Sequence, residues 1–222
     1  MSERSTEQLI HDLAQDVPPV RRIPALRAVM TAVVAGWAIA VAVTWISGMP
    51  LIDFVRSIPW GDPEFASVLA GLALIAVGAT LAALATAVPG REKVATASGG
   101  AALLGAVLAL GGGLWAVFSA PPRGAADLTG CLMCMSHAAA LALLPGLVAS
   151  LFLVWAYARQ PLVGAGFAAA GTVALGGLVV HISCRGGGAL HMLLGHALAP
   201  VFLGFALAVP IGLLVRYWGQ RA

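Results

Sequence analysis

The sequence predicts an all-α fold: an integral membrane bundle of six transmembrane helices, preceded by a short amphipathic helix. Only 9% of the 222 residues are charged and 60% are hydrophobic, whereas soluble domains carry about 25% charged residues. Six apolar stretches reach the length of about 20 residues that a helix needs to cross a bilayer. Because every backbone polar group in lipid must be hydrogen-bonded internally, we expect each stretch to be a closed helix.

The expected spans are 27–47, 66–88, 96–118, 136–157, 161–183 and 190–216. Glycine- and proline-rich segments separate them, as at Val88-Pro89-Gly90 and Gln160-Pro161. The first 27 residues are polar and the apolar run that follows is too long for the core of a signal peptide, so the first span should remain as an anchor. The predicted organisation is therefore 1–26 as an N-terminal segment, 27–216 as the membrane domain and 217–222 as a tail.

The distribution of positive charge predicts the orientation of the helices. With the N-terminus in the cytoplasm, nine of the 12 Lys and Arg residues fall in cytoplasmic segments, and only Arg56, Arg123 and Arg185 fall outside. This agrees with the excess of positive charge in cytoplasmic loops. We therefore expect a multi-pass membrane protein with both termini in the cytoplasm. The net charge of +3 reflects these loop residues, and no direct contact with nucleic acid is expected.

The N-terminal segment has the pattern of an amphipathic helix. Ser5 and Gln8 match a capping box, and Leu9, Ile10 and Leu13 follow at helical spacing. So short a helix is marginal in water, and docking into a groove of a partner protein would stabilise it. A flexible leader and a helix on the lipid surface are the alternatives.

Most side chains that can bind a metal ion fall in one part of the chain. All three cysteines and four of the five histidines lie between Cys131 and His196. In the predicted topology they meet at the outer face, where the fourth helix begins, the fifth ends and the sixth begins. Such groups are costly in an apolar protein without a use. The candidate ligands are Cys131, Cys134, His137, His181, Cys184, His191 and His196.

Thiolate and imidazole ligands suit Zn(II), and soft sulfur ligands also suit Cu(I). The nearby Met133, Met135 and Met192 favour copper. His191 and His196 are five positions apart and do not share one face of an α-helix, so one of them is expected to be structural unless the helix begins between them.

Two other interpretations of the cysteines remain open. Cys131 and Cys134 form a Cys-x-x-Cys pair that could become a disulfide on the oxidising side of a membrane, with Cys184 as a third, reactive thiol. The cysteines and histidines could also be purely structural.

A resemblance to a known family adds a functional expectation. Residues 6–24 read Thr-Glu-Gln-Leu-Ile-His-Asp-Leu-Ala-Gln-Asp-Val-Pro-Pro-Val-Arg-Arg-Ile-Pro. This segment, the six spans, the cysteine at the start of the fourth and the His-x-x-Cys at the end of the fifth resemble the NrsF-type anti-sigma factors. These are six-helix inner-membrane proteins whose cytoplasmic N-terminus holds an extracytoplasmic-function (ECF) sigma factor. The resemblance implies that cysteines at the periplasmic side, here Cys131 or Cys134 and Cys184, respond to metal or oxidative stress.

The combined expectation is a transcription regulator and not an enzyme. The N-terminal segment would sequester the ECF sigma factor, and the periplasmic Cys/His residues would sense a metal, with copper favoured, or an oxidant. The partner-binding residues would be Leu9, Ile10, Leu13, Asp16, Pro18, Val20, Arg21 and Arg22. The alternative is a membrane thiol oxidoreductase, or a metal-binding or transport protein, that uses the Cys-x-x-Cys pair. Ligands gathered at one end of the bundle favour sensing over transport.

Overall fold

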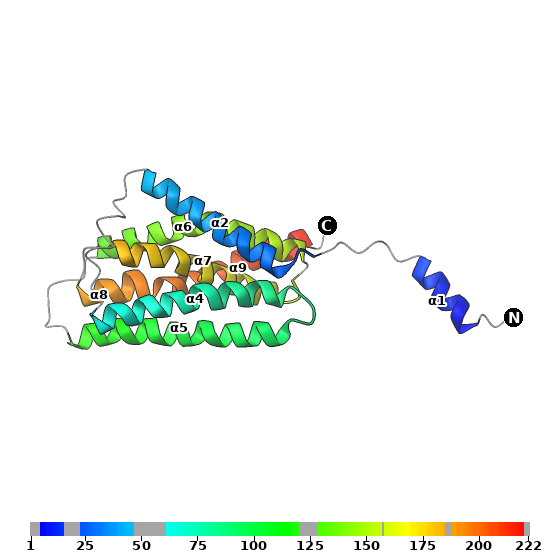
Figure 1. Ribbon diagram of the computed structural model, residues 1–222, viewed down its shortest axis with the longest axis horizontal. Coiled ribbons are helices and arrows are strands. Elements are labelled where there is room, and N and C mark those ends of the chain that lie inside the picture. The colour runs from blue at the N-terminus through cyan, green and yellow to red at the C-terminus, as the bar shows by residue number, and fades with distance from the viewer. Residues whose placement is uncertain are drawn as a thin grey trace.

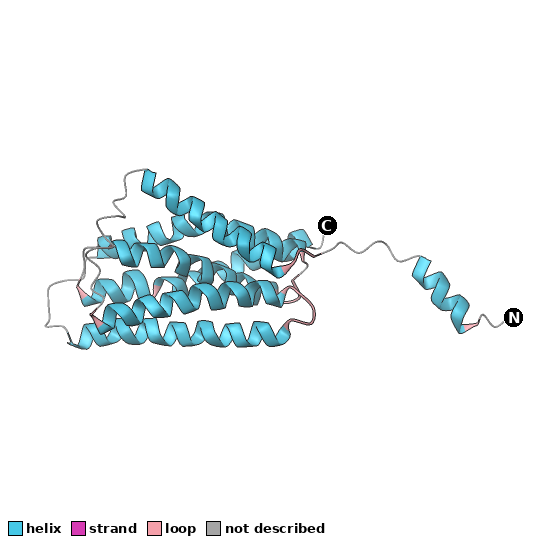
Figure 2. Cartoon of the chain, in the orientation of Figure 1, coloured by secondary structure: helices cyan, strands magenta, loops and turns pink. Residues whose placement is uncertain are grey.

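The computed structural model describes residues 5–15, 23–46, 61–119, 128–156, 158–184 and 188–219, and its regular elements in these ranges are all helices (Figures 1 and 2). Six of the helical segments are long and apolar enough to cross a membrane. The predicted all-α membrane bundle is therefore confirmed, and the chain is a multi-pass membrane protein.

The first five spans are α2 (Leu26–Ile46), α4 (Pro63–Thr86), α5 (Glu92–Ser119), α6 (Leu128–Trp155) and α7 (Pro161–Ser183). The sixth, Ala189–Gly219, is built from three consecutive segments. These are α8 (Ala189–His191), the π-helical η1 (Met192–Ala197) and α9 (Ala199–Gly219).

The observed helix ends differ from the predicted ones most clearly in the fourth span. Helix α6 begins at Leu128 and not near residue 136, so Cys131 and Cys134 lie inside the helix and not in the loop before it. The sixth span continues to Gly219, which places Tyr217 and Trp218 in the helix. The predicted fourth span begins at the polar pair Ser136-His137, and the hydrophobic residues 131–135 before this pair continue the helix toward Leu128.

Helices α4 and α7 form the centre of the bundle. Helix α4 packs against α5 and α7, and α7 also packs against α6 and α9. Glycines allow the closest approaches: a Cβ on Gly71 of α4 would lie 2.5 Å from the backbone nitrogen of Ala109 in α5. Helix α2 lies outside this core, mainly against α6, and the Trp37 Nε1–H donates to the Leu175 carbonyl of α7 at 3.0 Å.

The helices alternate in direction along the bundle (Figure 1). The two ends of the bundle carry different kinds of polar side chain. The start of α6, the end of α7 and the start of α8 lie at one end, which carries the cysteines and histidines. The other end holds the starts of α2, α5 and α7 and the ends of α4, α6 and α9. Its described cations are Arg27, Arg91, Lys93, Arg159 and Arg216.

The N-terminal helix α1 (Thr6–Gln15) lies apart from the bundle (Figure 1). Its first turn has the expected capping box: the Gln8 backbone N–H donates to Ser5 Oγ at 3.3 Å, and the Ser5 N–H donates to Gln8 Oε1 at 3.4 Å. The side chain of Ile10 in α1 is 62% exposed. Of the expected partner-binding residues, Asp16, Pro18, Val20, Arg21 and Arg22, and the side chains of Leu9 and Leu13, lie outside the described residues.

Candidate metal centre

Three helix ends bring four potential ligands together. Cys134 comes from α6, and Cys184 is the first residue after α7. His191 ends α8, and His196 lies in η1. One ligand atom from each of the four lies within 4.8 Å of the others. We refer to Cys134, Cys184, His191 and His196 as the Cys/His centre.

His191 lies at the middle of this group. Its Nε2 is 3.3 Å from the Cys134 Sγ and 3.3 Å from the Cys184 Sγ, and the two sulfurs are 3.7 Å apart. On the other side of the ring, Nδ1 is 3.7 Å from the Cys131 Sγ. Cys131 is buried, and it contacts the opposite edge of the His191 ring from outside the four-residue group.

The spacing of these atoms fits a tetrahedral metal ion. Ligands at the usual bond lengths of about 2.0–2.3 Å from a tetrahedral ion lie roughly 3.3–3.8 Å from one another. The three distances among Cys134 Sγ, Cys184 Sγ and His191 Nε2 fall in this range. The Cys/His centre thus has the ligand types and the spacing to hold a metal ion.

The π-helical segment explains how both histidines reach the same site. In η1 the hydrogen bonds close over five residues, as the bond from the Leu198 N–H to the Leu193 carbonyl at 2.9 Å shows. Residues five apart are therefore neighbours along this segment, and the His191 and His196 rings have centroids 5.2 Å apart. π-Helical turns are rare and occur often at functional sites. The expectation that one of these two histidines is structural assumes α-helical spacing, and it does not take a π-helical turn into account.

Gly195 of η1 faces α6. A Cβ at this position would lie 3.4 Å from the Cys131 Cα and 3.6 Å from the Cys134 Cβ, which are ordinary van der Waals distances. An alanine would therefore fit here, and only a larger side chain would press against the helix that supplies the thiols.

His196 carries a nitrogen that lacks a partner. Its side chain is 3% exposed, and Nδ1 has no hydrogen-bond partner among the described residues. An unsatisfied buried polar atom costs about 1–3 kcal/mol. A bound ion is one way to satisfy the ring, and this supports the view that the centre is built for a ligand.

His181 lies next to the Cys/His centre, where its ring contacts the ring of His196. Its Nε2–H donates to the Phe65 carbonyl at 3.2 Å, and its ring stacks on the Phe65 ring with centroids 4.3 Å apart. The other neighbour is His196, whose ring meets it edge-on at 5.2 Å. Because the Phe65 carbonyl can only accept, Nε2 carries the proton. His181 thus links the centre to the first turn of α4.

The remaining sequence candidates lie elsewhere. His137 is exposed, and its Nδ1 is 2.7 Å from the Met133 carbonyl of its own helix. Six positions after Cys131, it lies about 120° around the helix from that buried residue, because each residue turns an α-helix by roughly 100°. Met133 is 56% exposed and Met192 packs against the core around Leu72. The methionines therefore give little support to copper as the metal.

Comparisons with known proteins assign no family to this arrangement. No family model, no curated protein and no solved structure matches the chain.

Proposed function

We propose that this protein is an anti-sigma factor of the bacterial inner membrane. Its N-terminal segment holds an ECF sigma factor, and binding of a metal ion at the Cys/His centre releases it. The convergence of Cys134, Cys184, His191 and His196 from three helix ends carries the sensing part of this proposal. The partner rests on the resemblance of residues 6–24, and an exposed α1 with Ile10 uncovered is compatible with it.

The proposed orientation places the Cys/His centre at the periplasmic face. The described cations at the opposite end, such as Arg91, Lys93 and Arg159, then lie in the cytoplasm with both termini. In this orientation a metal ion could reach its ligands from the periplasm, and the sigma factor would bind on the cytoplasmic side.

The ligand set favours a soft or borderline transition metal. Two thiolates and two imidazoles in tetrahedral spacing suit Zn(II), and the thiolates also suit Cu(I). Both ions are therefore candidates for the signal. Cys131 and His181, which contact the ligands from outside, would set ring orientation as outer-shell partners do in other metal sites.

The energy available from such a site is large enough to drive a switch. Reversing a two-state population from 1:99 to 99:1 takes about 5.5 kcal/mol of differential binding, and a structural metal site supplies on the order of 10 kcal/mol. The ion would join α6, the end of α7 and the α8–η1 segment. A repacking of these helices is the change that would reach the cytoplasmic end.

Copurification tests both parts of the proposal. The tagged full-length protein should retain a sigma factor, identified by mass spectrometry, and should lose it when Zn(II) or Cu(I) is added. Cys184→Ser and His191→Gln should retain the sigma factor with metal present, whereas the exposed His137→Gln should behave as wild type. Removal of residues 1–24 should abolish binding in all conditions.

Different failures have different meanings. A sigma factor that stays bound whatever metal is added would overturn metal sensing and leave the anti-sigma role. Failure to capture any sigma factor would overturn the anti-sigma role, whatever the metal affinity.

A membrane thiol oxidoreductase is the second candidate, and the 3.7 Å distance between the Cys134 and Cys184 sulfurs favours it. That enzyme would oxidise the Cys134–Cys184 dithiol to a disulfide as a membrane quinone takes up the two electrons and two protons, and a dithiol substrate would then reduce the disulfide by thiol–disulfide exchange. Catalytic quinone reduction that persists after removal of residues 1–24 would support it.

A further inference from the structure

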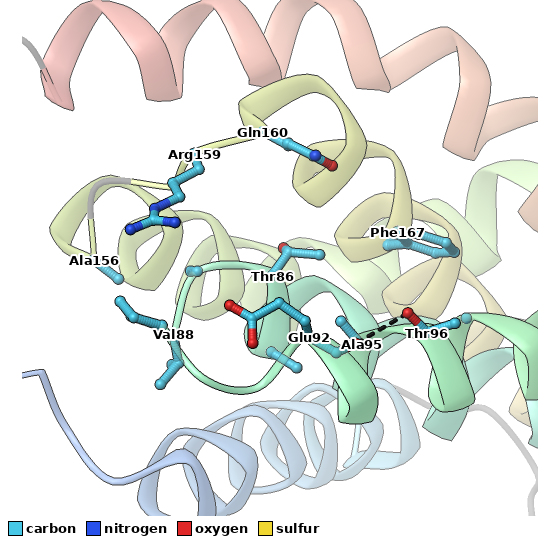
Figure 3. A pocket seen from close by; sticks show the side chains of 13 residues that line it. Thr86, Val88, Glu92, Ala95, Thr96, Ala156, Arg159, Gln160 and Phe167 are labelled. Carbon is cyan, nitrogen blue, oxygen red and sulfur yellow. Dashed lines mark hydrogen bonds between the residues drawn. The ribbon is translucent and has the colours of Figure 1, made fainter.

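A second candidate site lies at the opposite end of the bundle from the Cys/His centre. A pocket of about 550 Å³ opens where α4 and α6 end and α5 and α7 begin (Figure 3). The end of α4 with Thr86 contributes one wall, the first turns of α5 a second, and the connection from α6 to α7 a third. The predicted sensing function uses none of these residues.

The pocket contains one anionic and one cationic side chain. Glu92 starts α5, Arg159 precedes α7, and Figure 3 shows the two side chains directed toward each other across the opening. No ion pair within 4.0 Å joins these two described residues. Glu92 Oε1 accepts from the Gly90 N–H at 3.1 Å, so the second carboxylate oxygen and the Arg159 guanidinium are the charged groups that a molecule entering between them would meet.

On the α5 side, Thr96 follows Glu92 by one turn, whereas the Thr86 Oγ1 faces α7, 3.3 Å from where a Cβ on Gly164 would lie. The Thr96 hydroxyl donates to the Glu92 backbone carbonyl at 3.0 Å, and the Thr86 hydroxyl donates to the Ala83 carbonyl at 2.6 Å. Each hydroxyl has thus used its proton inside its own helix and offers only lone pairs to the pocket. Donors gather on the other side, where Arg159 and the amide of Gln160 stand.

The inner part of the pocket is apolar. Phe167 of α7 and Gly99 of α5 face each other there, and a Cβ on Gly99 would lie 3.3 Å from the Phe167 Cζ. Leu103, one helical turn after Gly99, is 69% exposed on surface that would face lipid chains, and Val163, one turn before Phe167 and nearer the start of α7, is 45% exposed. Charged groups at a helix end beside an apolar, lipid-facing groove match the position of a phospholipid at the membrane interface.

We propose that this pocket binds the headgroup of an aminophospholipid of the phosphatidylethanolamine type. Arg159 and Gln160 bind the phosphate, and Glu92 with the Thr96 hydroxyl accepts hydrogen bonds from the primary ammonium. A purely anionic headgroup lacks the cation and meets repulsion from Glu92. A choline headgroup has the charge but no N–H donors for the hydroxyl.

Native mass spectrometry of the detergent-purified full-length protein tests this selectivity. The protein is titrated with phosphatidylethanolamine, phosphatidylglycerol and phosphatidylcholine that carry identical acyl chains. We expect the first to bind about ten times more tightly than the other two. Glu92→Gln should abolish the preference over phosphatidylglycerol, and Arg159→Gln should weaken all three lipids.

Two further variants keep the test decisive. Lys93→Gln removes a charge from the same turn of α5 but does not line this pocket, so its lipid preference should equal that of wild type. Thr96→Val removes acceptor lone pairs at almost constant volume and should lower the preference over phosphatidylcholine if Glu92→Gln fails to fold. Equal binding of the three lipids to wild type, or an unchanged preference in Glu92→Gln and Thr96→Val, would overturn the proposal.

Discussion

The Sγ atoms of Cys134 and Cys184, fifty positions apart in the chain, lie 3.7 Å from each other, and His191 Nε2 lies 3.3 Å from both. The structure therefore adds a second candidate thiol pair, Cys134 with Cys184, to the Cys131-x-x-Cys134 pair that the sequence suggests. Cys131 contacts the opposite edge of the same imidazole. The sulfurs of Cys134 and Cys184 could bind a metal ion or form a disulfide with each other, but not both at once.

Mild oxidation should link Cys134 to Cys184 in preference to Cys131. Diamide accepts the two electrons and two protons that the thiols lose as the S–S bond forms. Peptide mapping of the oxidised full-length protein should find the 134–184 cross-link, and prior loading with Zn(II) should suppress it. A dominant 131–134 cross-link would show that the thiols approach each other differently in solution.

Replacing a ligand of the Cys/His centre should weaken metal binding more than replacing a neighbour. Loss of an outer-shell partner costs about 10- to 100-fold in affinity, and Cys184→Ser or His191→Gln should exceed that. Competition with a chromophoric chelator measures the affinity, and Co(II) reports thiolate ligands by its charge-transfer absorption. His137→Gln is the control, since this ring is exposed. Wild-type affinity in Cys184→Ser would contradict the assignment.

His181 should affect affinity without changing the ligand set. It holds the Phe65 carbonyl and faces the His196 ring, so His181→Phe should weaken binding by about 10- to 100-fold. The Co(II) absorption spectrum should keep its wild-type band positions, whereas His196→Phe should shift them. A shifted spectrum in His181→Phe would make His181 a direct ligand.

Gly71 should be far less tolerant of alanine than Gly111. A Cβ at Gly71 would lie 2.5 Å from Ala109 N and 2.6 Å from Gly105 O, so α4 and α5 would have to separate, whereas a Cβ at Gly111 meets nothing within 4 Å. Overpacking of this kind costs about 1–3 kcal/mol. Thermal unfolding in detergent should show a lower Tm for Gly71→Ala and an equal or higher Tm for Gly111→Ala. Equal Tm values for the two variants would refute the close approach.

The six spans could be predicted because the requirement that they satisfy is local. A stretch that lies in lipid must be apolar and long enough, and both properties can be counted along the chain. The start of α6 could not be found in this way, since the polar Ser136 and His137 interrupt the apolar run while the helix continues back to Leu128.

The sequence predicts which residue types form the candidate site, but not which of the candidate residues belong to it. Topology places Cys134, Cys184, His191 and His196 at one end, yet only packing separates them from His137 and His181. His137 faces outward because of its position around α6, and His181 is held by a carbonyl 116 positions away. The five-residue spacing of His191 and His196 was the one local sign of a π-helical turn, and an α-helical analysis treats it as a mismatch.

The π-helical turn also has a mechanical meaning. Segment η1 holds one residue more per turn than an α-helix would, and α9 continues from it to Gly219 at the far end of the bundle. If a change at the ligands moved the extra residue out of this turn, everything after it would rotate by about 100° around the helix axis. A change at the Cys/His centre would in this way be transmitted, as a rotation of the last span, to its C-terminal end on the opposite side of the membrane.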